Sequence, residues 1–102
     1  MNFQFRTGRK SMNRYFVLLK TDPTRTHEVT QKLRNFPQNP SSGVTLYYTM
    51  NCFGNWDLSI WFEAENHNSV IDFVQNKICQ IPGVLQTYTI PTTPIREYVN
   101  WK

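Results

Sequence analysis

Two stretches of alternating residues, 44–51 and 57–63, constrain the fold of this chain most. Alternation with a period of two is typical of a β-strand that is buried on one face. The glycine-containing segment Phe53-Gly54-Asn55 separates the two stretches and predicts a hairpin between them. The predicted faces are Val44, Leu46, Tyr48 and Met50 against Thr45, Tyr47 and Thr49 in the first strand, and Leu58, Ile60 and Phe62 against Ser59, Trp61 and Glu63 in the second.

A strand and a helix are predicted before the hairpin. Residues 15–20 are apolar on both faces, which is typical of a buried strand. Thr24 or Thr26 can cap the helix that follows, with Glu28 in its first turn, where the helix dipole favours an acid. The apolar stripe of this helix is Val29, Leu33 and Phe36.

A helix and a strand are predicted after the hairpin. The helix begins at the cap cluster 66–69 and ends at the turn Ile81-Pro82-Gly83-Val84, and the strand covers 85–90. The order β-α-β-β-α-β is the ferredoxin-like pattern of an α+β domain. It predicts a four-stranded antiparallel sheet with both helices on one face.

The other face of this sheet has no further element in the sequence to cover it. Bare aromatic side chains across a sheet form an unusually large apolar patch for a monomer. We therefore expect a second copy to pack sheet against sheet, with Tyr47 and Trp61 in the dimer interface. The residues predicted on this face are Phe16 or Val17, Tyr47, Trp61 and Thr87.

Length and charge indicate one domain at 15–98, a basic flexible tail at 1–14 and a C-terminal end at 99–102. The tail holds four of the 11 basic residues and no acid, whereas the rest of the chain has 7 of each. A neutral body lacks the broad basic surface that selects nucleic acid. The tail itself has two interpretations, a solubilising end or an arm whose Phe3 and Phe5 stack on nucleic-acid bases.

The cysteines and histidines give no sign of a metal, a cofactor or a disulfide scaffold. Cys52 and Cys79 form no CxxC pair, and His27 and His67 are scattered along the sequence. We expect two reduced thiols in a cytoplasmic protein. The longest apolar run, at 15–19, is too short to cross a bilayer.

Three segments together resemble the ligand-binding domain of the Lrp/AsnC family, known as the RAM domain (regulation of amino-acid metabolism). They are the turn Gly54-Asn55-Trp56-Asp57, the strand 57–64 that follows it, and the turn 81–84 with Thr87 and Thr89 after it. The resemblance covers 15–97 and implies dimers built by sheet pairing, assembly of dimers into rings, and amino-acid effectors bound near the Gly-x-x-Asp turn. Family members that regulate transcription carry a helix-turn-helix domain, which fourteen residues cannot build. The match is therefore to the stand-alone form, for which we expect no specific DNA binding. A full-length Lrp/AsnC regulator is a candidate partner.

The residue types in these segments suit the binding of a free amino acid. Asp57 can pair with the ammonium, and the backbone N–H of Gly54 can reach the carboxylate because no Cβ stands in the way. Trp56 can form a wall of the pocket, and threonine hydroxyls can come from a neighbouring subunit. The candidate ligand-binding residues are Gly54, Asn55, Trp56, Asp57, Thr87 and Thr89.

Each assignment has a simpler alternative. In these alternatives Asp57 only closes its own turn, Trp56 packs between dimers, and the threonines are common strand residues. Cys52 and Phe53 lie where the family resemblance implies small polar residues.

A small dimeric barrel enzyme of the monooxygenase or isomerase type is the alternative function. General acid–base chemistry needs a base and an orienting partner in a cleft. No histidine lies at an inward strand position, and Lys20 and Glu63 fall at strand ends, where we expect solvent. We therefore assign no catalytic residue.

Overall fold

The predicted hairpin is present in the computed structural model, which describes residues 13–96. Strands β2 (Val44–Asn51) and β3 (Leu58–Ala64) pair antiparallel. The backbone N–H of Cys52 donates to the carbonyl of Asp57 at 2.9 Å and closes the connecting loop. Gly54 in this loop has a φ of 104°, a conformation that favours glycine.

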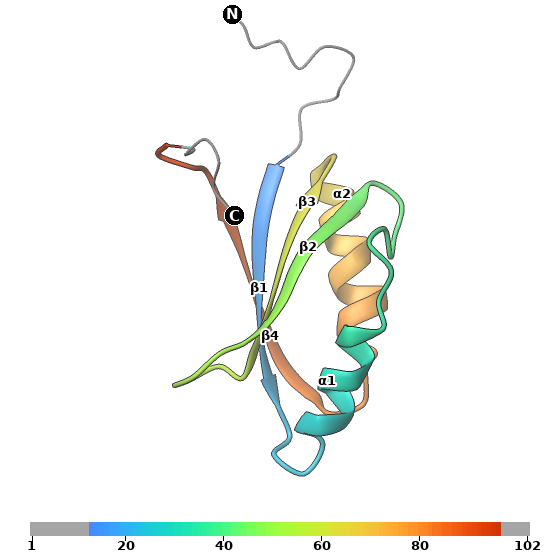
Figure 1. The fold of residues 1–102 in the computed structure, drawn as a ribbon. Coiled ribbons are helices and arrows are strands. Elements are labelled where there is room, and N and C mark those ends of the chain that lie inside the picture. Colours follow the sequence, from blue (N-terminus) through green and yellow to red (C-terminus); the bar gives the residue numbers. More distant parts are fainter. Residues whose placement is uncertain (1–12, 97–102) are drawn as a thin grey trace, which may run out of the picture.

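Strands β1 (Asn13–Thr21) and β4 (Val84–Thr92) complete an antiparallel sheet with the order β2-β3-β1-β4. Helix α1 (Thr26–Arg34) and helix α2 (His67–Phe73), which continues into the π-helical turn η2 (Val74–Ile78), cover one face of it (Figure 1). No helix covers the other face in the part of the chain that the structure describes. The predicted ferredoxin-like α+β fold is confirmed.

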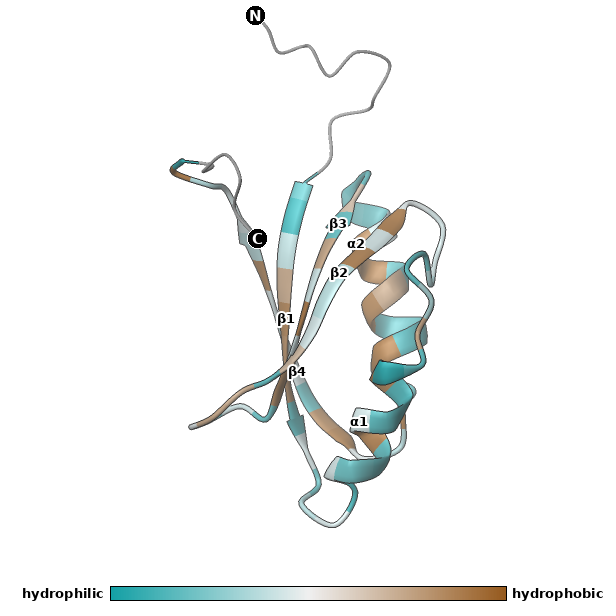
Figure 2. Ribbon diagram, in the orientation of Figure 1, coloured by the Kyte–Doolittle hydropathy of each residue, from teal (hydrophilic) through white to brown (hydrophobic). Residues whose placement is uncertain are grey.

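The core lies between the sheet and the two helices. Both helices alternate apolar and polar positions along their length, as amphipathic helices do (Figure 2). Ring contacts join the layers, since Phe62 of β3 packs edge-on against Phe73 of α2 with ring centroids 5.0 Å apart. The largest fully buried side chains are Phe62, Phe73, Leu19, Ile60, Ile78, Val17, Val29 and Val44.

A β-bulge in β2 changes the predicted faces of that strand. Leu46 pairs with Phe62, but Tyr48 pairs with Trp61, so Tyr47 is an extra residue in the ladder. The bulge places Tyr48 on the open face of the sheet with Trp61, and the prediction that it shares a face with Val44 was wrong.

The structure also decides which residues of β1 and β4 lie on the open face. Phe16 pairs with Trp61 and lies there, whereas Val17 is fully buried under the helices. Thr87 pairs with the buried Leu19, and its hydroxyl lies 3.8 Å from the sulfur of Cys79 on the helix side. Thr87 was therefore predicted on the wrong face.

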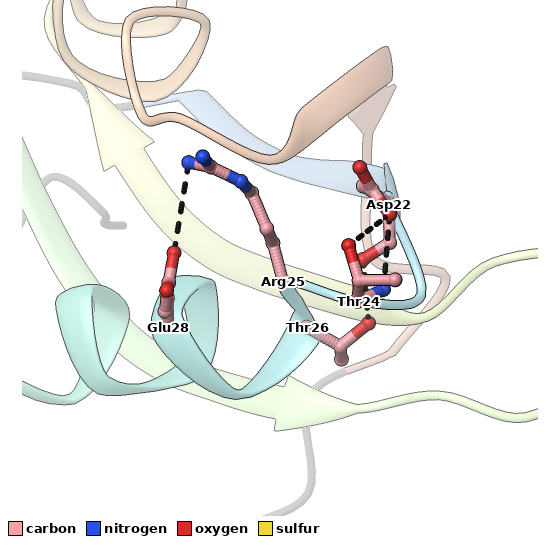
Figure 3. Close-up of polar contacts among 5 residues, drawn as sticks. All are labelled: Asp22, Thr24, Arg25, Thr26 and Glu28. Atoms are coloured by element: carbon pink, nitrogen blue, oxygen red, sulfur yellow. Dashed lines mark hydrogen bonds and ion pairs between the residues drawn. The ribbon is translucent and has the colours of Figure 1, made fainter.

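The two helices begin differently. Asn66 caps α2, because its Oδ1 accepts a hydrogen bond from the Ser69 N–H at 2.9 Å, as the cap cluster predicts. The N-cap of α1 is Arg25, whose side chain makes no capping bond, so the prediction of a Thr24 or Thr26 cap was wrong. Asp22 instead holds the turn before α1 through Thr24 (Figure 3).

Strand β1 begins at Asn13, two residues before the predicted start. Residues 1–12 of the predicted tail and the predicted end at 99–102 lie outside the described residues. None of the helices in 13–96 is long and apolar enough to cross a membrane.

Candidate functional site

The Asp57 carboxylate joins the start of β3 to the end of β1. Its Oδ2 accepts hydrogen bonds from the backbone N–H of Thr21 at 2.8 Å and from the Thr21 hydroxyl at 3.1 Å. The Asp57 N–H donates to the carbonyl of Leu19 at 2.9 Å. The turn is closed by backbone groups, so the carboxylate is not needed for that purpose. Its other oxygen, Oδ1, makes no hydrogen bond with the residues the structure describes.

A lysine lies against the same loop. The Lys20 ammonium donates to the carbonyl of Asn55 at 2.8 Å and is exposed to solvent. A Cβ added at Gly54 would meet nothing within 4 Å, so the space above this backbone is open. The loop therefore presents a cation, an anion and accessible backbone close together.

Two aromatic side chains flank these groups. The ring of Trp56 stacks on Tyr88 of β4, with centroids 6.2 Å apart and an angle of 19° between the planes. Phe53 projects into solvent with 95% of its surface exposed. Cys52 is half-buried, and it and Cys79 are free thiols.

The structure brings some of the predicted ligand-binding residues together and separates others. Gly54, Asn55, Trp56 and Asp57 form one continuous loop. Thr87 and Thr89 pair with Leu19 and Val17, so they lie on the helix side of β4, whereas Tyr88 beneath Trp56 lies on the open side. In the part of one subunit that the structure describes, neither threonine makes a hydrogen bond to the loop. Their role in a site shared with another subunit stays a prediction.

Thr21, Lys20 and Tyr88 were not among the predicted site residues. Thr21 is 2% exposed, and its hydroxyl contacts both Asp57 and the hydroxyl of Thr26, at 2.7 Å. The sequence did contain a signal for Thr21, because it lies two residues after Leu19 and so falls on the same buried face of β1. The prediction ended that strand at Lys20 and so missed it.

The open face of the sheet carries a cluster of aromatic rings around Trp61. Phe16 and Tyr48 both contact Trp61 edge-on, with centroids 4.6 and 5.6 Å away. The bulge residue Tyr47, which was predicted in the interface, is 46% exposed and lines a hollow beside these rings. Tyr88 on the same face is 57% exposed. This surface is the one expected to meet a second subunit.

Glu63 does not lie in solvent as expected. It is 5% exposed, and its Oε2 lies 3.4 Å from Nε of Arg14. Among the described residues no group of three or more histidines, cysteines or acids is placed to hold a metal ion.

No family model matches the sequence, and no curated protein matches it. Solved structures are similar in fold. The crystal structure of FFRP-DM1 has a TM-score of 0.65 at 22% identity, over 79% of this chain and 99% of that one. A protein from Thermus thermophilus has a TM-score of 0.65 at 20% identity, over 84% of this chain and 99% of its own. A transcriptional regulator from Neisseria meningitidis, in complex with L-Met, has a TM-score of 0.69 at 13% identity, over 88% of this chain and 56% of the regulator.

Proposed function

We propose that this chain is a stand-alone ligand-binding domain of the Lrp/AsnC (RAM) type, which binds an amino acid at subunit interfaces and modulates transcription regulators through assembly. The observation that carries the proposal is the shared fold with a regulator in complex with L-Met. Two solved structures that match over 99% of their own length support this fold as a unit of that size. Because the chain carries the Gly-x-x-Asp turn of the resemblance at 54–57, we place the ligand there.

The charges around the loop complement a zwitterion. Thr21 holds Oδ2 of Asp57 and leaves Oδ1 to accept from an ammonium. Lys20 and the open backbone at Gly54 supply positive charge and an N–H donor for the carboxylate of the ligand. Trp56, fixed by its stack on Tyr88, forms one wall against the ligand side chain.

The rest of the pocket comes from neighbouring subunits. In one subunit the loop is open to solvent on the side of Phe53, and a small-molecule site normally buries most of its ligand. Thr87 and Thr89 of another subunit are the proposed hydroxyl donors. Dimers form through the open face, with Tyr47 and Trp61 in the interface, and higher oligomers or mixed oligomers with a full-length regulator complete the site.

The proposed role is regulation in the cytoplasm and not catalysis. A general base needs an orienting partner at a cleft. The buried acid Glu63 is instead paired with Arg14 at one end of the sheet. The neighbour with a stated activity is a transcriptional regulator, which supports a regulatory assignment.

A thermal-shift screen against the twenty amino acids tests the proposal, with Asp57→Asn and Asp57→Ala as matched variants. A ligand at about a hundred times its dissociation constant stabilises the folded protein by about 2.7 kcal/mol, which raises the melting temperature by about 10 °C or more. Asp57→Asn keeps an oxygen that accepts from Thr21 but has no charge for the ammonium. We expect the shift to disappear in both variants, and the unliganded stability to fall mainly in Asp57→Ala.

Two results of this screen contradict the proposed site. If no amino acid raises the melting temperature, the proposal that the chain binds an amino acid is wrong. If Asp57→Asn keeps the full shift, the ligand binds elsewhere than at this loop.

A further inference from the structure

Phe53 is one of the most exposed apolar side chains among the described residues. It has 95% of its surface in solvent, at the tip of the loop between β2 and β3. In Figure 1 this hairpin leaves the sheet on the side away from the helices. Moving an exposed phenylalanine ring from water into an apolar hollow lowers the free energy of the protein.

A hollow of about 220 Å³ lies at the other end of the same sheet. Its lining includes Phe16 and Trp61 from the aromatic cluster, Tyr47 from the bulge, and Thr92, Thr93 and Pro94 at the end of β4. Cavities of roughly 150 Å³ already hold a benzene molecule. The hollow is therefore large enough for the ring of a phenylalanine.

We propose that Phe53 of one subunit inserts into this hollow of a second copy of the chain. The strand register sets the two features at opposite ends of the sheet. Asn51 and Leu58 pair at the hairpin end, and Asn13 and Ala64 pair at the end with the hollow. When two sheets face each other, a two-fold axis can lie between them and run perpendicular to the strands. Each hairpin then lies next to the hollow of the other subunit. Both insertions then form at once, as in an isologous dimer.

This inference rests on one part of the proposed function, the dimer that forms through the open face. It does not depend on the binding of an amino acid. The first test is sedimentation equilibrium of the full chain with Phe53→Ser, against Ile71→Ser as a matched control. Ile71 is a partly exposed apolar residue on α2, away from the open face. We expect Phe53→Ser to raise the dimer dissociation constant about tenfold for each ring, or about a hundredfold for two. Ile71→Ser should leave the dissociation constant within about twofold of the wild type, as surface substitutions usually do.

The second test is a disulfide trap in a Cys52→Ser, Cys79→Ser background. Phe53→Cys combined with Thr93→Cys should give a covalent dimer on mild oxidation. Phe53→Cys combined with Thr24→Cys, at the exposed turn before α1, should not.

The inference is overturned by a wild-type dimer that Phe53→Ser leaves unchanged, or by a dimer in which the Thr93 pair fails to cross-link. If the wild-type chain is monomeric, both this inference and the dimer in the proposed function are wrong. The thermal shift with amino acids is measured on the wild type separately, so a failure of ligand binding is distinguished from a failure of the interface.

Discussion

At the residue scale, Asp57 shows how a single carboxylate serves structure and leaves capacity for binding. Oδ2 takes two hydrogen bonds from Thr21, which fix the orientation of the group. A carboxylate has room for several more donors, and Oδ1 has none among the described residues. The alternative that Asp57 only closes its own turn does not describe what the side chain does.

Two glycines with nearly the same backbone conformation allow strain to be separated from crowding. Gly54 has a φ of 104° and Gly83 a φ of 102°. A Cβ at Gly54 meets nothing within 4 Å, whereas one at Gly83 lies 2.8 Å from Cβ of Arg25 and 3.0 Å from Cγ2 of Val29. Either alanine costs about 1–2 kcal/mol from the positive φ. Crowding in a packed region adds about 1–3 kcal/mol.

We therefore predict that Gly83→Ala lowers the free energy of unfolding by at least about 1 kcal/mol more than Gly54→Ala does. Urea denaturation of the two variants without ligand measures the difference. Equal losses would mean that the contacts around Gly83 relax and that only the backbone strain matters.

At the element scale, the start of α1 depends on Asp22 and not on a cap within the helix. The N–H of Thr24 donates to Oδ1 of Asp22 at 2.9 Å, and the Thr24 hydroxyl donates to the same oxygen at 2.8 Å (Figure 3). These bonds, the backbone one first, lower the pKa of Asp22 below its ordinary value of 3.8, and the charge of Arg25 contributes to the same shift. The charged form is thus favoured in the folded state.

The sign of this pKa shift predicts a pH dependence. A carboxyl with a lowered pKa in the folded state stabilises the protein above its unfolded pKa, and this contribution is lost as the pH falls through the folded pKa. Asp22→Asn keeps an acceptor for Thr24 but has no charge. We expect the wild type to exceed Asp22→Asn in urea midpoint at neutral pH, and the gap to shrink below pH 3.8. A gap that is the same at both pH values would show that the charge is irrelevant to this turn.

The elements themselves were predictable from the sequence, but two of their details were not. Alternation and turn residues are local signals, and they predicted all four strands and both helical segments. The bulge at Tyr47 has no such signal, because two successive tyrosines fit either face of a strand equally well. It is decided by the pairing with Trp61 and Phe62, which lie in another strand. The face of Thr87 likewise follows from its register with Leu19.

At the scale of the whole molecule, the open sheet face is the dominant feature. Its inner strands carry Phe16 and Trp61, and its edge strands add Tyr48 and Tyr88, which are 42% and 57% exposed. Four aromatic residues on a face that no helix of residues 13–96 covers are typical of an interaction surface. The sequence predicted that such a face exists, because the helices fall on one side of the sheet. It did not predict the hollow beside Trp61, which is assembled from residues that are distant along the chain.

The most direct test of the account is the state of association of the wild-type chain, measured by sedimentation equilibrium at micromolar concentrations. Burial of the aromatic face on a second copy predicts a dimer or a multiple of dimers. In that case the melting temperature should also rise with protein concentration. A monomer at every concentration would contradict the account, because the bare face would then be stable in water and the shared pocket would have no second subunit to complete it.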